Sequence, residues 1–267
     1  MMPNKRRIMK TKYKITIIIA IILLIGFIAI YYYSKDEKVK ILKEYSSSGQ
    51  LIGTNEYVIR DGDTIMQGKF VNYNERGIKI SEGQFIDNEP YGICSYYDDK
   101  GKIETVFFRK NSKINLECKY YNYNGLLEKY IMCDDLGKTA FTIYFDEKGV
   151  TKYDGYFQIE TYQYKYANKS KFNITEEQNL KIGDTLKYNY IVANIPNAKR
   201  SFTIENVGLD NAKVKRTIKK VEPCQIDVKE VLTKKGKNTI RSIVKYEFND
   251  GVTPVFTDTI SFDVEVH

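Results

Sequence analysis

The sequence has few of the residues on which enzyme chemistry usually depends. It has a single histidine, His267, so a serine–histidine triad and histidine-based metal sites are excluded. Its four cysteines are scattered and include no Cys-x-x-Cys pair, which argues against a zinc site. Glycine patterns that bind phosphate or dinucleotides are also missing. The sequence therefore predicts a protein that is not an enzyme, with no catalytic, cofactor-binding or metal-binding residues.

Tryptophan is absent and proline is scarce, whereas the chain has 23 tyrosines and 13 phenylalanines. Aromatic residues of this kind favour half-buried strands over helices. Four cysteines are too few for a disulfide-built scaffold, so hydrophobic cores must hold the fold. At 267 residues, the chain is long enough for one large or two modest domains. We therefore expect an all-β protein.

The formal net charge of +8 comes mainly from the N-terminus. Six basic residues lie among the first 14 positions, and the rest of the chain is nearly neutral. A protein that binds nucleic acid needs clustered lysine and arginine within its folded part. The charge distribution thus predicts a basic N-terminal tail at residues 1–14 and no nucleic-acid partner.

The segment Ile15–Tyr33 contains 19 residues without a charge. As a helix it would be about as long as the ~30 Å hydrocarbon core of a bilayer is thick. It lacks the polar positions of a core helix and the small residues of a signal-peptide cleavage site, so we expect a retained transmembrane helix, with a cleaved signal as the alternative. The preceding basic residues predict a cytoplasmic N-terminus. Residues 34–267 are then periplasmic or extracellular, anchored to the cell (inner) membrane by a single pass.

The middle of the chain contains an internal repeat in which an aromatic residue precedes a glycine by four positions. The last four of these pairs are spaced by 24 residues. Short polar residues followed by glycine suit a hairpin turn, because glycine adopts the left-handed conformation cheaply. A period of 24 residues accommodates two strands and two turns, which predicts an array of hairpins with the aromatics between them. The predicted repeat aromatics and turn glycines are Tyr45, Tyr73, Tyr97, Tyr121 and Phe145, and Gly49, Gly77, Gly101, Gly125 and Gly149.

One unit of this repeat has a recognisable pattern. Glu82-Gly83-Gln84-Phe85 is followed by a polar turn, Gly92, the pair Tyr96-Tyr97, a second polar turn and Gly101-Lys102. This pattern resembles the bacterial variant of the membrane occupation and recognition nexus (MORN) repeat, and the resemblance extends over about residues 41–157. It implies a β-hairpin array used for protein or membrane association, without catalytic residues.

Three acidic pairs lie near these glycines: Asp98-Asp99, Asp134-Asp135 and Asp146-Glu147. A calcium loop needs oxygen ligands at alternating positions, whereas these acids are adjacent, and lysine follows two of the pairs. Aspartate at a turn also accepts hydrogen bonds from nearby backbone N–H groups. The pairs therefore indicate turns rather than metal sites.

Two cysteines occupy equivalent repeat positions, since Cys94 and Cys118 each lie seven residues before a repeat glycine. Equivalent positions on successive hairpins are ~9.5 Å apart at ~4.8 Å per strand, and a disulfide requires Cα atoms within ~7 Å. We expect no disulfide between them, and we expect both to be small buried side chains.

After Tyr156 the repeat gives way to alternating apolar residues. Leu186, Tyr188, Tyr190 and Val192 alternate with polar positions, and the segment Val255–Val266 shows the clearest alternation of all. Six or seven such strands in about 100 residues predict an antiparallel, immunoglobulin-like β-sandwich. The Cys-Trp-Cys core of true immunoglobulin domains is absent, so the sequence predicts the architecture and no kinship.

The predicted organisation is a basic tail, a membrane helix, a linker, a MORN-like hairpin array, a second linker and a β-sandwich. The boundaries are residues 1–14, 15–33, 34–43, 44–160, 161–172 and 173–267, in that order. We expect a non-enzymatic cell-envelope binding or scaffolding protein that contacts another protein. Two alternatives remain: a module that binds the membrane surface, glycans or peptidoglycan, and an antitoxin-like role found with bacterial MORN-repeat proteins, which would require a cytoplasmic partner.

Overall fold

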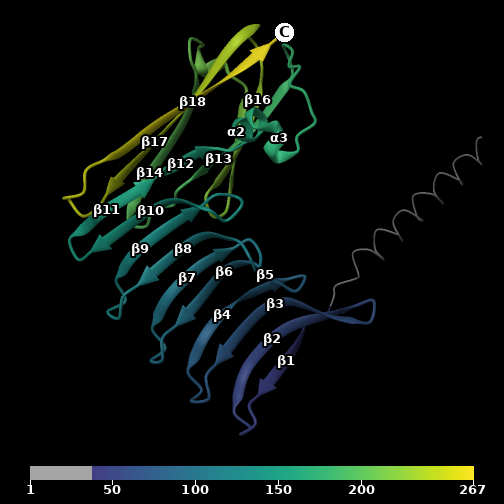
Figure 1. Ribbon diagram of the computed structural model, residues 1–267, viewed down its shortest axis with the longest axis vertical. Coiled ribbons are helices and arrows are strands. Elements are labelled where there is room, and N and C mark those ends of the chain that lie inside the picture. Colours follow the sequence, from purple (N-terminus) through teal and green to yellow (C-terminus); the bar gives the residue numbers. More distant parts are fainter. Residues whose placement is uncertain (1–37) are drawn as a thin grey trace, which may run out of the picture.

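The computed structural model describes residues 38–267, which fold into antiparallel β-sheets with very little helix (Figure 1). The all-β class predicted from the aromatic composition is confirmed. Within the described residues, no helix is long and apolar enough to cross a membrane. The predicted tail 1–14 and the predicted membrane helix Ile15–Tyr33 lie outside the described residues.

Most of the repeat region forms one 11-stranded sheet with the strand order β1-β2-β3-β4-β6-β7-β8-β9-β10-β11. This is the meander of hairpins that the repeat predicts. The short strand β5 pairs only with β4. The strands are β1 (Lys40–Tyr45), β2 (Leu51–Arg60), β3 (Asp63–Tyr73), β4 (Lys79–Ile86), β5 (Glu89–Pro90), β6 (Gly92–Tyr97), β7 (Ile103–Arg109), β8 (Asn115–Tyr121), β9 (Leu127–Cys133), β10 (Thr139–Asp146) and β11 (Gly149–Gly155).

Each repeat aromatic marks an irregularity in the sheet. The strand register shifts by one residue next to Tyr45, Tyr73, Tyr97, Tyr121 and Phe145, which is the signature of a β-bulge. A bulge bends its strand and increases the local twist. The 24-residue repeat therefore repeats a bulge as well as a turn.

The turns after these bulges are held by a short polar residue three positions before the glycine, which is Ser46 in the first turn and an aspartate or asparagine in the other four. Asp98 Oδ1, for example, accepts hydrogen bonds from the backbone N–H groups of Lys100 and Lys102 at 2.9 and 2.8 Å. Gly49, Gly77, Gly101 and Gly125 have φ between +75° and +83°, a region in which other residues are strained.

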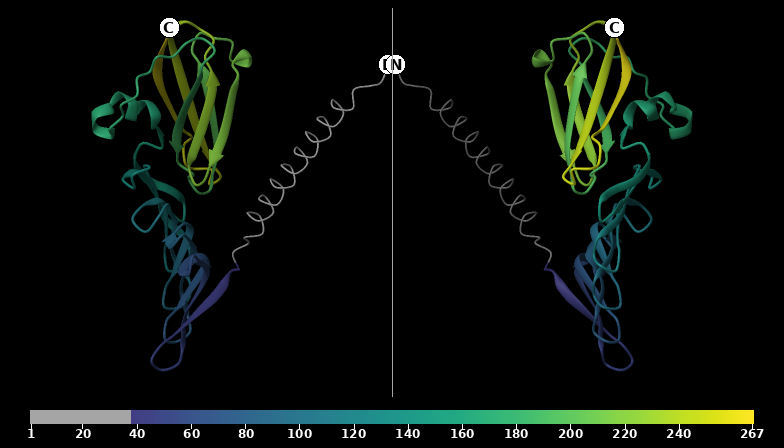
Figure 2. Two further views of the ribbon diagram at one scale, coloured as in Figure 1. Left: turned by 90° about the vertical axis from the view of Figure 1, so that its right-hand side faces the viewer. Right: turned by 90° about the vertical axis from the view of Figure 1, so that its left-hand side faces the viewer.

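The two faces of the repeat sheet have different surroundings. Strand register places Ile93, Phe108, Glu117, Met132 and Phe141 in one row across β6 to β10. The sandwich packs on this face, where Met132 and Phe141 are fully buried. Figure 2 shows the sandwich displaced toward one side of the sheet. We call the face that carries this row the inner face and the opposite one the outer face.

The C-terminal part is a two-sheet β-sandwich with strand orders β12-β13-β16-β15 and β14-β17-β18. Rings from the two sheets meet in its core, as in the pairs Tyr188–Phe262 and Tyr190–Phe202, with centroids 5.4 and 5.3 Å apart. The strands are β12 (Gln158–Glu160), β13 (Thr185–Val192), β14 (Ala198–Asn206), β15 (Arg216–Val221), β16 (Gln225–Val231), β17 (Gly236–Phe248) and β18 (Phe256–Val266), with a 3-10 turn η1 (Asn211–Lys213) before β15.

The predicted domain boundaries need correction. Strand β1 begins at Lys40, inside the predicted linker 34–43. Strand β12 lies inside the predicted repeat region 44–160 but pairs with β13 of the sandwich. The predicted linker 161–172 contains the helices α2 (Tyr162–Ala167) and α3 (Lys169–Phe172), and it connects two strands of one sheet. Because β12 has only three residues, its sequence shows no alternation of apolar and polar positions. Only its pairing with the distant β13 assigns it to the sandwich.

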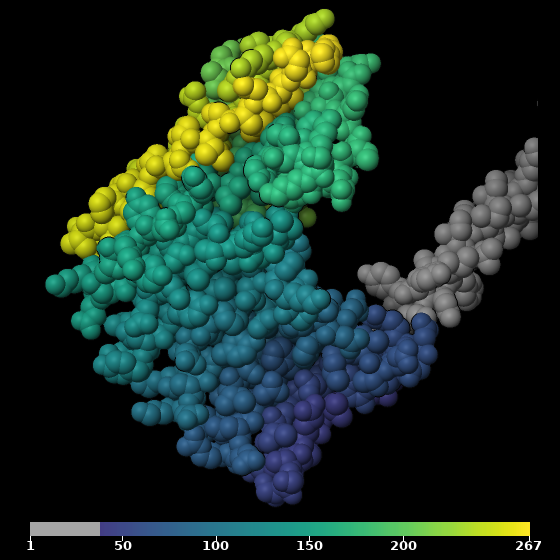
Figure 3. Space-filling view, viewed as in Figure 1, coloured from purple at the N-terminus to yellow at the C-terminus, as the bar shows by residue number. Residues whose placement is uncertain are grey.

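The repeat sheet and the sandwich share one hydrophobic core. Phe157 lies at its centre, with ring centroids 5.7 Å from Phe141 of the repeat sheet and 5.6 and 6.1 Å from Tyr246 and Phe256 of the sandwich. Tyr153 of β11 also packs against Phe256 at 4.4 Å, and the space-filling view shows the yellow strand β18 lying against the end of the sheet (Figure 3). The shared core fixes the two parts relative to each other.

Candidate binding cleft

The residues predicted from the repeat serve the framework of the sheet. The repeat glycines lie at the turns, although Gly149 differs from the others, with φ +137°. Tyr97 donates a hydrogen bond to Glu82, Phe145 packs against the shared core, and Tyr45 is exposed on the edge strand β1. The repeat therefore builds a scaffold, and its predicted residues do not converge on a single site.

A cleft of about 560 Å³ opens where the sandwich extends over the inner face of the sheet. One wall consists of β3, β4, β6 and β7, and the other is the turn between β15 and β16. The lining residues are Lys69, Phe70, Val71, Glu82, Gly83, Gln84, Tyr91, Gly92, Ile93, Ser95, Phe108, Val221 and Glu222.

The sheet wall of the cleft contains an accessible apolar patch, formed by Tyr91, Ile93 and Phe108, beside polar side chains such as Lys69 and Gln84. Tyr91 and Phe108 meet edge to face with ring centroids 6.2 Å apart. Ile93 lies beside them in the middle of the inner face, yet it is 62% exposed. Pairs of aromatic rings flanked by aliphatic side chains are common in ligand-binding surfaces. This patch suits the apolar side chains of a bound molecule.

A side recess of about 200 Å³ continues from the cleft toward the shared core. It shares Ile93, Phe108 and Glu222 with the cleft, and its other lining residues are Val106, Phe107, Glu117, Lys119, Asn194 and Pro223.

Glu117 is the buried charged group of this recess and is only 5% exposed. The Tyr130 hydroxyl donates a hydrogen bond of 2.5 Å to Glu117 Oε1 and accepts one of 2.8 Å from the Asn194 backbone N–H. Burial raises the pKa of Glu117, whereas the bond from Tyr130 and the charges of Lys119 and Arg200 act in the opposite direction. In the described part of the chain, Glu117 has no basic partner within 4 Å.

The acidic pairs at the turns are engaged with the backbone. Asp134 Oδ1 accepts hydrogen bonds from the N–H groups of Leu136 and Lys138, and Asp146 Oδ1 accepts from Lys148 and Gly149. These bonds are the turn contacts that the sequence predicts. Within residues 38–267, His, Cys, Asp and Glu side chains form no group of three or more that could hold a metal ion.

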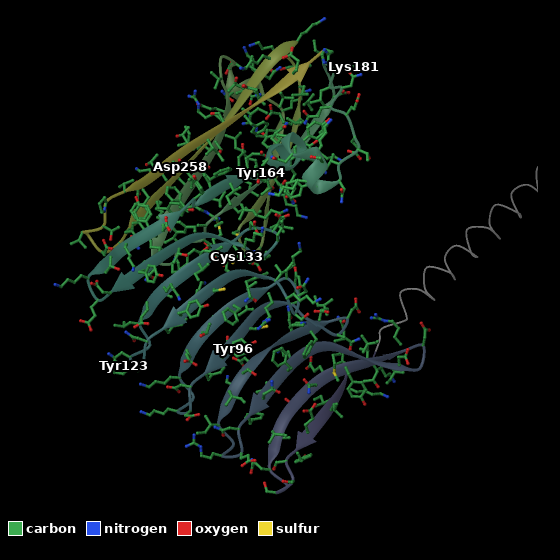
Figure 4. All side chains as sticks on the ribbon, viewed as in Figure 1. Tyr96, Tyr123, Cys133, Tyr164, Lys181 and Asp258 are labelled. Carbon is green, nitrogen blue, oxygen red and sulfur yellow. The ribbon has the colours of Figure 1, made fainter. Side chains whose placement is uncertain are left out.

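All four cysteines are buried. Cys94 and Cys118 lie on the same face, each directly opposite Phe107, which separates them as the repeat spacing predicts. The sequence did not reveal that Cys118 and Cys133 are neighbours on β8 and β9 (Figure 4 labels Cys133). The hydrogen bond between these two thiols, together with burial, raises the pKa of Cys118.

The sequence analysis assigned no residue to a cleft, although Glu82, Gly83, Gln84 and Gly92 of the recognised repeat unit line it. Ile93, Phe108 and Glu117 lie on three successive strands, and they become neighbours of Glu222 and Pro223 only when the sandwich folds back over the sheet. The sequence offered no signal for this site, because the apolar row around Glu117 becomes visible only with the strand register.

No protein-family model matches the sequence, and no curated protein is significantly similar to it.

Proposed function

We propose that this protein is a non-enzymatic binding protein of the cell envelope that holds a segment of a partner protein in the cleft between its repeat sheet and its sandwich. The observation that carries the proposal is the accessible apolar wall formed by Tyr91, Ile93 and Phe108. Recognition sites of this kind combine apolar surface with a few polar groups that fix orientation.

The rigidity of the cleft supports this function. Its two walls come from parts of the chain that share one core around Phe157. A preformed cleft loses little conformational entropy when a partner binds, so more of the contact energy contributes to affinity.

The remaining parts of the proposal concern architecture and location. The strand orders β12-β13-β16-β15 and β14-β17-β18 support an immunoglobulin-like sandwich, because they match the A-B-E-D and C-F-G arrangement of that fold. The 24-residue hairpin array supports a MORN-like assignment. Ile15–Tyr33 would anchor the protein in the membrane with its N-terminus in the cytoplasm, which leaves the cleft outside the cell or in the periplasm.

Binding of glycans through the repeat tyrosines is less favoured. Stacking on a sugar requires an open ring face. Three tyrosines of the outer face, spaced by 24 residues, instead have a basic side chain over the ring. Arg109, Lys129 and Lys152 lie over the rings of Tyr96, Tyr120 and Tyr144, at 5.8, 4.1 and 4.4 Å from the ring centroids. These cation–π contacts already use the ring faces.

Site-specific photo-crosslinking tests the proposed function. A photoreactive amino acid at Ile93 of the full-length protein, in membranes of its own cells, should yield one discrete adduct. The same group at Ile218, which is 48% exposed on β15, is the control and should yield none. A Val221→Asp change on the opposite wall should weaken the Ile93 adduct. Equal adducts at Ile93 and Ile218 would contradict the proposal. So would an Ile93 adduct whose yield is unchanged by Val221→Asp.

A further inference from the structure

The side recess contains a buried carboxylate, Glu117, which the apolar patch of the cleft does not explain. Glu117 lies in the row Ile93, Phe108, Glu117, Met132 and Phe141, in which every other member is apolar. Placing a carboxylate in a buried position costs free energy unless a partner compensates it. An apolar residue at 117 would simply have extended the shared core. The carboxylate therefore points to a role in the recess that Glu117 lines.

We propose that the recess accepts a cationic side chain, of the arginine or lysine type, from the segment bound in the cleft. The inference rests on the proposed function, since it specifies the chemistry of the same bound segment. The recess volume of about 200 Å³ admits one long side chain and little else. Its entrance at Ile93 and Phe108 is continuous with the cleft.

The lining matches the two halves of such a side chain. Val106, Phe108 and Pro223 form apolar walls along which a methylene stem packs. Glu117 then meets the charged head, and Glu222 on the turn between β15 and β16 adds a second carboxylate on the opposite wall. A guanidinium or ammonium group donates charge-assisted hydrogen bonds to carboxylates, which are about twice as strong as neutral ones.

The basic groups near the recess do not neutralise both of its carboxylates. Lys119 lines the recess, but the two carboxylates outnumber it. The Arg200 guanidinium is held by the backbone carbonyl oxygens of Val192 and Ala193 at 2.8 and 3.1 Å. A bound cation therefore faces a net negative lining. An anionic ligand would have Lys119 as its only cationic partner among the lining residues.

Three small probes of similar shape and different charge test the proposal on the full-length protein in phosphatidylcholine nanodiscs. Benzamidine is cationic, benzamide is neutral and benzoate is anionic, and ligand-observed NMR measures the binding of each. We expect benzamidine to bind at least about tenfold more tightly than the other two. Glu117→Gln should reduce this preference to about twofold or less, whereas Glu104→Gln, at an exposed position of β7, should leave it unchanged.

Equal affinity for the three probes, or a preference for benzoate, would overturn the proposal. A preference that Glu117→Gln leaves intact would also overturn it. If circular dichroism shows that Glu117→Gln does not fold, Glu222→Gln on the exposed turn is tested in its place. The comparison of the three probes on the unmodified protein tests the proposal in either case. The Ile93 crosslink distinguishes failure of this inference from failure of the proposed function. If Ile93 forms its adduct but the probes show no preference for the cation, the cleft binds a partner and the recess does not bind a cationic side chain. If neither the adduct nor the preference is found, the proposed function is rejected as well.

Discussion

At the scale of single residues, the sandwich contains one buried ion pair whose partners are fully engaged. Glu230 is 1% exposed and accepts hydrogen bonds from Arg216 Nε at 2.8 Å and from the Tyr188 hydroxyl at 2.9 Å. Arg216 also donates to the Ile204 carbonyl oxygen at 2.7 Å, and Asn206 contacts both charged residues. The network joins the two sheets of the sandwich through polar contacts.

Removing one member of this pair should be costly. We expect Glu230→Ala to lower the free energy of unfolding by about 3–5 kcal/mol, because it leaves the Arg216 charge buried without its partner. Urea unfolding of the full-length protein in detergent, followed by circular dichroism, measures the loss. Glu265→Ala, at an exposed position of β18, should change stability by less than about 0.5 kcal/mol. Similar losses for the two variants would show that the network does not stabilise the sandwich.

At the scale of elements, the turns of the repeat sheet depend on side chains as well as glycines. Asn122 Oδ1 accepts hydrogen bonds from the N–H groups of Asn124 and Leu126 at 2.9 and 3.0 Å. Tyr123 lies at the tip of the same turn and is 79% exposed (Figure 4). The polar residue three positions before the glycine thus fixes the turn, and the exposed tip contributes little to it.

The two asparagines of this turn form a matched pair for a test. We expect Asn122→Ala to destabilise the protein by about 1–2 kcal/mol, because two backbone N–H groups lose their acceptor. Asn124→Ala removes only an exposed side chain and should be nearly neutral. Thermal unfolding of both variants measures the difference. If the two midpoints shift equally, the side-chain bonds of Asn122 are not what holds the turn.

Helix α2 begins next to the half-buried carboxyl group of Glu160, whose protonation should affect stability. Burial raises the pKa of Glu160 to about 7, although the N–H groups of Gln163, Tyr164 and Tyr162 donate hydrogen bonds to it. The folded protein therefore holds this proton more tightly than the unfolded chain. The corresponding stabilisation is complete below the unfolded pKa of about 4.5 and is lost as the pH rises through about 7.

A comparison with Glu160→Gln isolates this effect. Between pH 5 and 8 the free energy of unfolding of the unmodified protein should fall relative to that of the variant, by at most about 1.4 kcal/mol per pH unit. Urea unfolding at several pH values measures both proteins. A difference that stays constant would show that folding leaves the pKa of Glu160 unchanged, and a change in the opposite direction would show that folding lowers it; either result contradicts the prediction.

At the scale of the whole molecule, the repeat sheet and the sandwich should behave as one cooperative unit. Tyr130, Met132, Phe141 and Ile143 of the sheet lie in the same buried cluster as the sandwich core. Units that share a core do not expose their surfaces independently, so a single unfolding transition is expected. This cooperativity also keeps the two walls of the cleft at a fixed separation.

Phe157 is the residue with which to test this coupling. Phe157→Ala should cost about 3–5 kcal/mol, because a large buried ring is removed. It should also separate unfolding into two transitions in calorimetry. Phe248→Ala, at the margin of the core, should leave a single transition. Two transitions in the unmodified protein would show that the shared core does not couple its two parts.

Features that depend on neighbouring residues could be predicted without the structure. Hairpin turns follow from short polar residues and glycine, so the meander and its 24-residue period were predictable from the turns near Gly77, Gly101 and Gly125. Strand alternation predicted β13 and β18 in the same way. These signals are local because backbone conformation and side-chain period are set within a few residues.

Features that depend on distant pairing could not be predicted before the fold was known. The assignment of β12, the contact of Cys118 with Cys133 and the cleft itself all require segments that meet only in the folded chain. Glu117 is the clearest case: in the sequence it is one more acidic residue on a strand, whereas the fold buries it between Phe108 and Met132, beneath the sandwich. Burial and partners set the chemistry of a carboxylate, and no local pattern specifies either of them.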